Sequence, residues 1–186
     1  MSDPRVKTPA GPKEVKGTID GRVITAGSVR IINSVRRIAA AENYTAEDVL
    51  SNSATDGQGT PWEFPNVGES GVILKGRIFI QTTALTPRIT LYLFSRRPTS
   101  EMDDNVANVA PSLADISFFV GQIDFPALED LGGVSASQAT PSTSGNLPMT
   151  YGGCDGTLYG IAVTREAITG ETANDQMGIT LEVEPY

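Results

Sequence analysis

Glycine and proline recur along the whole chain and leave no long stretch for a regular helix. The 186 residues include 19 glycines and 12 prolines. Both residue types interrupt helices, because proline lacks an amide donor and glycine is costly to order. Between them lie short runs rich in valine, isoleucine and threonine, which favour extended backbone. The pattern predicts an all-β chain of about seven or eight short strands. The length suits one domain and is hardly enough for two.

Two neighbouring segments have the clearest strand patterns. In 72–82, alternation predicts one shared buried face for Val72, Leu74, Ile78 and Ile80. In 87–97, apolar side chains occupy both parities, which favours a place in the middle of a sheet or at a subunit contact. The short connection TTALT predicts that these two strands pair as an antiparallel hairpin.

Four further segments favour strands: 17–35, 112–128, 157–164 and 177–186. Gly121 predicts a bulge or bend in the second of these strands. In the last segment, Ile179, Leu181 and Val183 alternate with polar residues. This alternation predicts a half-buried strand that anchors the carboxyl terminus.

Three connecting segments are harder to assign. Residues 36–51 contain alanines that favour helix, and Thr45 with Asp48 could form a capping box, but the helical period is imperfect and strand is slightly favoured. Residues 51–71 are expected to form a long loop, and 132–153 a flexible polar loop or a flat partner surface. Trp62 and Phe64 share one face of extended backbone. They would either stack a ligand or, as the favoured alternative, plug the core.

These segments predict an antiparallel β-sandwich of the jelly-roll type, formed by residues 18–186 as a single domain. Residues 1–17 are expected to form an extended basic arm, because prolines and glycines block helix there. The first 40 residues hold eight basic and three acidic side chains, a net charge of +5. Since the whole chain carries −8, the rest carries −13. A basic arm on an acidic body suits docking on an acidic surface, and a solvated terminus is the alternative.

The residue inventory argues against an enzyme. The chain has no histidine and a single cysteine, Cys154, which exclude the Ser-His-Asp and Cys-His devices and a thiolate metal site. It also has no Gly-rich phosphate loop of the GxxxxGK[ST] type. Cys154 is expected to be a small buried group, and no cofactor is expected. A net charge of −8 disfavours nucleic-acid binding.

Carboxylates gather after the strand of 87–97, where Asp103 and Asp104 follow Arg96, Arg97 and Pro98. Loop carboxylates are calcium ligands, but the spacing of a known calcium loop is missing. A catalytic carboxylate pair is a weaker alternative, because that chemistry needs two carboxyl groups across a cleft. The favoured interpretation is a polar loop that pairs with Arg96 and Arg97 or with a neighbouring molecule.

The order of several segments resembles a family of virion proteins. TPRITLYLFSRRPT, then DDNVAN, a strand ending IDFPAL, ATPSTSGNLPM and LYGIAVTREAIT are similar to uncharacterised virion proteins of tailed bacteriophages. Those proteins resemble capsid decoration, or cement, proteins. The likeness covers about residues 60–186 and contains no diagnostic motif. It implies a β-rich homotrimer on the outside of the phage head, bound to the major capsid protein, and it brings no catalytic residues.

The resemblance assigns contact roles to basic residues and leaves rival functions open. Candidate contacts with the capsid or a neighbouring subunit are Arg5, Lys7, Lys13, Lys16, Arg96 and Arg97. The rivals are a carbohydrate-binding β-sandwich module and a tail or neck component. The start of the chain lacks the apolar core of a signal peptide, and no apolar run is long enough to cross a membrane. These observations predict synthesis in a cytoplasm, and the resemblance implies that this is the cytoplasm of a host cell and that the virion is the destination.

Overall fold

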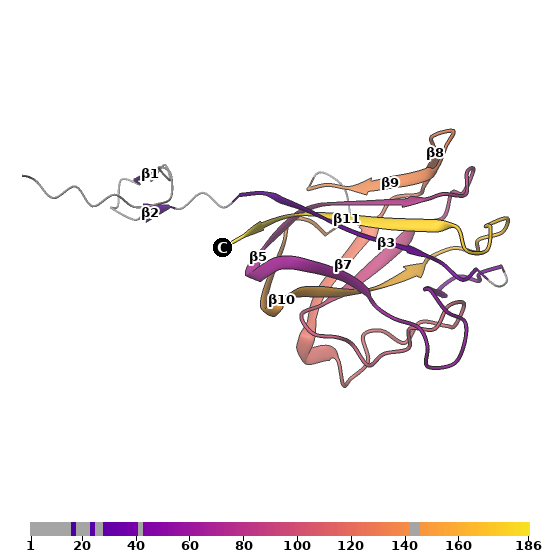
Figure 1. Ribbon diagram of the computed structural model, residues 1–186, viewed down its shortest axis with the longest axis horizontal. Coiled ribbons are helices and arrows are strands. Elements are labelled where there is room, and N and C mark those ends of the chain that lie inside the picture. The colour runs from indigo at the N-terminus through magenta and orange to yellow at the C-terminus, as the bar shows by residue number, and fades with distance from the viewer. Residues whose placement is uncertain (1–15, 18–22, 25–27, 41–42, 142–145) are drawn as a thin grey trace, which may run out of the picture.

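The computed structural model describes residues 16–17, 23–24, 28–40, 43–141 and 146–186 (Figure 1). Most of the expected arm, including Arg5, Lys7 and Lys13, lies outside the described residues. Lys16 is described only as part of a strand. The arm and its contacts therefore stay predictions.

The described chain is almost entirely β, which confirms the predicted fold class. Its strands are β1 (Lys16–Gly17), β2 (Val23–Ile24), β3 (Arg30–Arg37), β4 (Val49–Leu50), β5 (Trp62–Ile80), β6 (Ile89–Phe94), β7 (Phe119–Phe125), β8 (Glu129–Asp130), β9 (Ser135–Ala139), β10 (Met149–Thr164) and β11 (Gln176–Pro185). The helical element of this part of the chain is one turn of 3-10 helix, η1 (Ile116–Phe118). Within the described residues, no helix is long and apolar enough to span a bilayer.

Nine strands form one antiparallel sheet that folds into two layers. The main path runs β3-β11-β5-β10-β6-β7, with β9 on β5, β8 on β9 and β4 on β10. The long strand β5 joins the layers, because its first half pairs with β10 and its second half lies between β11 and β9. The layers meet where Phe125 of β7 packs on Gly76 of β5, and a Cβ added there would lie 3.1 Å from the ring. The result is sandwich-like.

The core confirms several expectations. All six residues of β6 are buried, and β6 lies between β10 and β7, as its two apolar faces predicted. Ile179, Leu181 and Val183 of β11 are buried, while Thr180, Glu182 and Glu184 are partly exposed. Gly121 lies at a register shift between β6 and β7, which confirms the predicted irregularity.

The predicted hairpin of 72–82 with 87–97 is wrong. In the structure β5 pairs with β9, β10 and β11, whereas β6 pairs with β7 and β10. Strand β10 therefore lies between them. A short connection allows a hairpin, but it does not require one when the chain can cross to the other layer.

The predicted common face of 72–82 is also wrong, because β5 contains a bulge. Glu182 of β11 pairs with Lys75, but the next residue, Val183, pairs with Ile73. Leu74 is the extra residue, and it shifts the alternation by one position. Ile73 is therefore buried with Ile78, while Leu74 is only partly buried.

The uncertain segments differ from the expectations in three places. In 36–51 the ends are strand, but the described middle is irregular, with Tyr44 bridging Ile168. Thr45 and Asp48 do interact: the Thr45 amide and hydroxyl both donate to the Asp48 carboxylate, at 2.5 and 2.9 Å. The expected loop of 51–71 ends early, because β5 starts at Trp62. The expected polar loop of 132–153 contains strand β9 and the start of strand β10.

Candidate functional site

The layer β3-β11-β5-β9-β8 turns one side away from the core, here called the outer face. The register places Val35, Gly178, Phe79, Ala136 and Glu129 in one row across five strands. A second row holds Asn33, Thr180, Arg77 and Gln138, and a third holds Ile31, Glu182 and Lys75. The outer face therefore has one largely apolar row beside rows of mixed polarity.

The apolar side chains of the outer face are unusually accessible. Val35 is 52% exposed and Ile31 is 61% exposed on β3, and Leu131 beside β8 is 64% exposed. An isolated exposed apolar residue is ordinary, but several on one sheet face indicate a contact surface. The outer face is the best candidate for a binding surface in the described chain.

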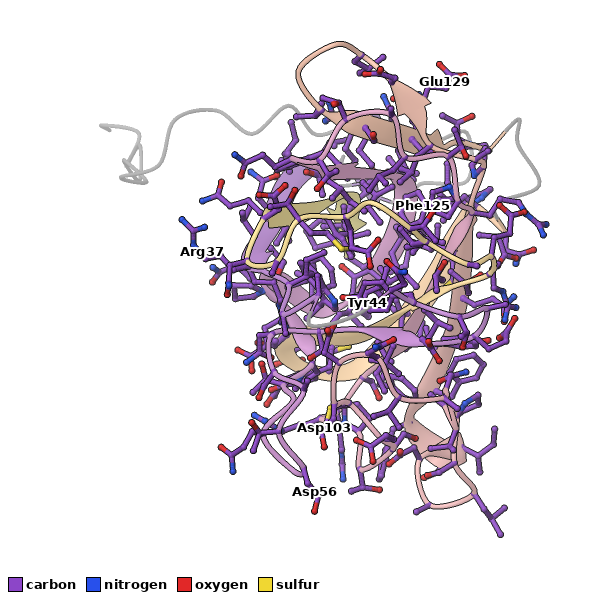
Figure 2. The ribbon with its side chains drawn as sticks, turned by 90° about the vertical axis from the view of Figure 1, so that its right-hand side faces the viewer. Arg37, Tyr44, Asp56, Asp103, Phe125 and Glu129 are labelled. Atoms are coloured by element: carbon purple, nitrogen blue, oxygen red, sulfur yellow. The ribbon has the colours of Figure 1, made fainter. Side chains whose placement is uncertain are left out.

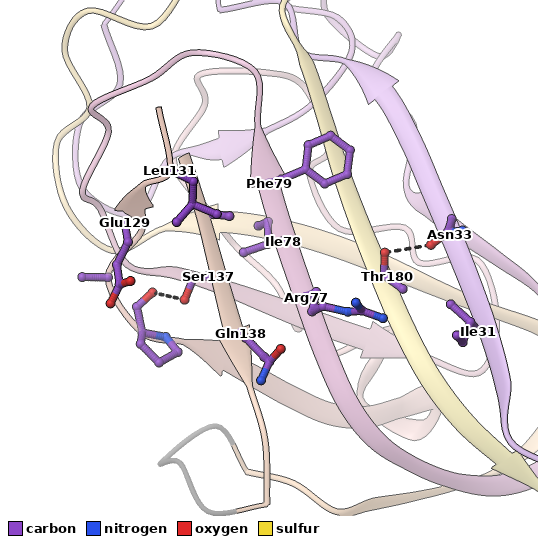
Figure 3. Close-up of a pocket in the computed structure, with 13 residues that line it drawn as sticks. Ile31, Asn33, Arg77, Ile78, Phe79, Glu129, Leu131, Ser137, Gln138 and Thr180 are labelled. Carbon is purple, nitrogen blue, oxygen red and sulfur yellow. Dashed lines mark hydrogen bonds between the residues drawn. The ribbon is translucent and has the colours of Figure 1, made fainter. Parts of the chain in front are cut away.

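A groove of about 710 Å³ follows this face (Figure 3). Its floor includes Phe79 and Thr180, and Pro126 and Leu131 border it. Gly178 has a structural role here, because the Phe79 ring lies directly over it and an added Cβ would overlap the ring. A glycine opposite an aromatic residue thus lets the ring lie across the neighbouring strand.

The polar groups in the groove suit binding better than catalysis. Arg77 forms an ion pair with Glu182 at 2.8 Å, and Lys75 lies 3.8 Å from the same carboxylate. The Thr180 hydroxyl donates to the Asn33 side-chain oxygen at 2.8 Å (Figure 3). The two cations share this one carboxylate, so the three side chains together carry a net charge of +1. The lining residues hold no nucleophile with a base beside it.

The acidic residues after β6 are structural, and their predicted pairing with Arg96 and Arg97 is wrong. Asp103 and Asp104 are 3% and 1% exposed. The Asp103 carboxylate accepts from the amides of Gly57 and Gly59, both at 2.6 Å. Figure 2 shows Asp103 at the opposite end of the molecule from Glu129, which borders the groove.

The Asp104 carboxylate is equally occupied. It accepts hydrogen bonds from the Ala40 amide at 2.9 Å, the Ser51 amide at 2.6 Å and the Tyr44 hydroxyl at 2.9 Å. Burial raises the pKa of Asp104, although these hydrogen bonds act in the opposite direction. N–H and O–H donors turned toward both carboxylates leave an unsuitable environment for a cation. In the residues that the structure describes, no group of three potential metal ligands is found.

Arg96 and Arg97 lie apart from the groove-lining residues. The Arg96 guanidinium lies 4.7 Å from the centre of the Phe118 ring, and Arg97 forms an ion pair with Glu63 at 3.7 Å. Their proposed role in capsid contact stays a prediction. The structure does not bring them together with the outer face.

The remaining singled-out side chains belong to the interior. Trp62 is 1% exposed and donates to the Leu50 carbonyl oxygen at 3.3 Å, and Phe64 is fully buried. Arg36 covers the Trp62 ring at 4.2 Å. The favoured core interpretation is confirmed, and neither ring is available to stack a sugar. Cys154 is buried as expected, and burial raises the pKa of its thiol.

Sequence reasoning missed the outer face, although a signal for it was present. In Arg30–Arg37, the apolar residues Ile31, Ile32 and Val35 occur on both parities. That pattern indicates a strand with apolar side chains on two faces, but one of those faces is exposed. Which parity faces the core depends on the pairing of β3 with β11, and that pairing is not local.

Comparison with known proteins leaves the function to be argued from the site. No protein-family model matches the chain. No curated protein matches it either.

Proposed function

We propose that this chain is a structural protein of a virus particle, a decoration protein that binds the outside of a bacteriophage head and stabilises the shell. The observation that carries the proposal is the outer face, which combines exposed Ile31, Val35 and Leu131 with a shallow groove. The segment-order resemblance to virion proteins supports the choice of partner. A tail or neck protein could use the same kind of surface, so location is an outcome of the test.

The chemistry of the outer face favours a protein partner. The centre of a protein interface is depleted in charge and contains apolar anchors surrounded by polar groups. Here the apolar row has Phe79 between Gly178 and Ala136. The row beside it offers Asn33, Thr180, Arg77 and Gln138. A carbohydrate-binding module would instead present aromatic rings. Of the described large apolar side chains that are exposed, only Tyr186 is aromatic.

The function is tested with empty expanded heads of the virus that encodes the chain. Co-sedimentation would compare the wild type with Val35→Lys, which places a charge in the apolar row. The matched control is Leu113→Lys, because Leu113 is 91% exposed but lies outside the groove. Burying a charge in an interface is costly, so Val35→Lys is expected to bind at least about tenfold more weakly than the control.

Three results separate the alternatives. Saturable binding of the wild type and the control, with loss in Val35→Lys, supports the proposal. Binding to isolated tails but not to heads would replace the decoration role by a tail or neck role. Equal binding of all three proteins to heads would remove the outer face as the docking surface.

A further inference from the structure

Strand β3 has one edge without a partner strand. It pairs with β11 along Arg30–Arg37, and within the described chain it pairs with no other strand. The remaining backbone hydrogen bonds of the described residues do not involve Arg30–Arg37 either. Alternate residues of an antiparallel edge strand direct their N–H and C=O groups outward. Strand β3 therefore presents a row of free donors and acceptors, which is a template for another strand.

The arginines of β3 do not block this edge. Arg30 donates to the Asn66 carbonyl oxygen at 2.8 Å, Arg36 to that of Thr60 at 2.6 Å, and Arg37 to that of Asn174 at 2.7 Å. Charged side chains at an edge normally oppose strand addition. Here each guanidinium group is held by a carbonyl oxygen of this chain, so the backbone of the edge is left accessible.

A second strand pair in the same chain is not part of the nine-stranded sheet. Strands β1 and β2 pair with each other through Lys16↔Ile24 and Gly17↔Val23, and they form a separate two-stranded sheet. A two-stranded ribbon is at best marginally stable in water, because stability requires a third strand or a packing surface. The ribbon therefore gains by adding to an existing edge.

We infer that the β1–β2 segment of one copy adds to the free edge of β3 in a second copy of this chain. The added strand extends the layer β3-β11-β5-β9-β8. Its backbone N–H and C=O groups pair with free backbone groups at the edge of β3. Main-chain hydrogen bonds supply the affinity in this kind of strand addition. The exposed side chains Ile31 and Val35 lie beside the new strand and would become partly covered.

The geometry favours a second copy over the same chain. Residues 25–29 separate β2 from β3, and a connection of this length is sufficient for an antiparallel hairpin. Within the single chain, β2 and β3 nevertheless do not pair with each other. Extended, five residues reach about 17 Å, which is enough to cross to an adjacent molecule.

Such a contact is heterologous, because the ribbon of one copy meets a different element of the next. Heterologous contacts form closed rings when the rotation between copies permits. A ring of three copies agrees with the homotrimer expected from the resemblance. Contact between copies is measured without any capsid, so failure of this inference and failure of the decoration role are distinguishable.

The test is disulfide cross-linking between two co-expressed full-length variants. One carries Val23→Cys, and the other carries Ile31→Cys, Asn33→Cys or Val35→Cys, all in a Cys154→Ala background. The matched control is Gln138→Cys, because Gln138 is exposed on the same outer face but belongs to β9. We expect a reducible heterodimer with at least one β3 position, at about tenfold higher yield than with the control.

Light scattering on proteins without the introduced cysteines gives the second readout. The wild type is expected at three times the 19.7 kDa chain mass. Val23→Pro is expected at the monomer mass, since proline cannot donate to a strand ladder. The control is Val6→Pro, because residues 1–12 already contain three prolines. This variant should keep the wild-type mass.

Several outcomes would overturn the inference. One is a monomeric wild type at all concentrations, together with no heterodimer at any β3 position. Another is equal cross-linking at Gln138→Cys. A third is a disulfide that forms within one chain when Val23→Cys and Val35→Cys are combined, because that places the ribbon on its own β3.

Discussion

Three buried aspartates hold the irregular end of the molecule together. Asp103, Asp104 and Asp115 each accept hydrogen bonds from backbone amides of neighbouring loops. Loops outside sheets leave amide groups without ladder partners, and a buried amide without a partner is costly. A short carboxylate can satisfy two or three such donors at once. At this scale the acidic residues work as structural acceptors.

Asp115 provides the clearest pH-dependent case. Burial raises the pKa of its carboxyl group. Hydrogen bonds from the Ser100, Thr99 and Ser112 side chains and from the Thr99 amide have the larger, opposite effect, and together they lower the pKa to about 2. A lowered pKa in the folded state stabilises the fold above the pKa of the unfolded state, near 4. That stabilisation is lost as the pH falls from about 4 through about 2.

We therefore expect Asp115→Asn to reduce the free energy of unfolding by about 2 kcal/mol at pH 7, because charge-assisted hydrogen bonds are replaced by weaker ones. The difference from the wild type should shrink as the pH falls toward about 2. Urea unfolding at several pH values measures it. Asp155→Asn is the matched control, since Asp155 is exposed. A difference independent of pH would contradict the assignment.

At the scale of elements, close backbone approach fixes the loop that precedes β5. The Gly59 amide donates to Asp103, and a Cβ added at Gly59 would overlap the carbonyl group of Met102. Backbone atoms cannot move aside as the end of a flexible side chain can. Glycine is therefore required at this position for the loop to dock against the segment after β6.

Gly59→Ala is expected to destabilise the fold by about 3 kcal/mol, because the loop must move away and the hydrogen bonds to Asp103 are lost. Thermal unfolding followed by circular dichroism measures the change. Gly133→Ala is the control, since an added Cβ there meets nothing within 4 Å. Similar melting temperatures for both variants would show that the loop docks differently.

The way in which the strands pair also explains which of them could be predicted from local sequence patterns. β6 and β11 were found from local patterns, because each strand has a regular environment along its length. The hairpin of β5 with β6 was wrongly predicted, and the bulge at Leu74 was not foreseen. Both depend on the register with β10 and β11, and register is decided by partners distant in the chain.

At the scale of the whole molecule, the acidic segment after β6 is held to neighbouring loops by hydrogen bonds within the chain. Asp103 and Asp104 have their oxygens directed at N–H and O–H donors. Neither the mass nor the melting temperature of the purified chain is then expected to change with EDTA. Light scattering and calorimetry with and without the chelator test this. Dissociation, or a melting temperature lowered by several degrees, would restore the calcium interpretation.

The sequence alone determined the class of fold and much of the core. Spread glycines and prolines exclude long helices, alternation identifies half-buried strands, and the lack of histidine excludes the Ser-His-Asp and Cys-His devices. These properties are local, or are properties of composition, so they can be read without coordinates. The burial of Trp62 followed from the same reasoning.

Only the tertiary structure decided how the strands meet and which surface is left open. It placed β10 between β5 and β6, buried Asp103 and Asp104, and turned Ile31 and Val35 outward on β3. Each of these results depends on contacts between residues far apart in the chain. Local periodicity shows that a strand has two faces, but the face that meets the core is chosen by the strands that pack against it.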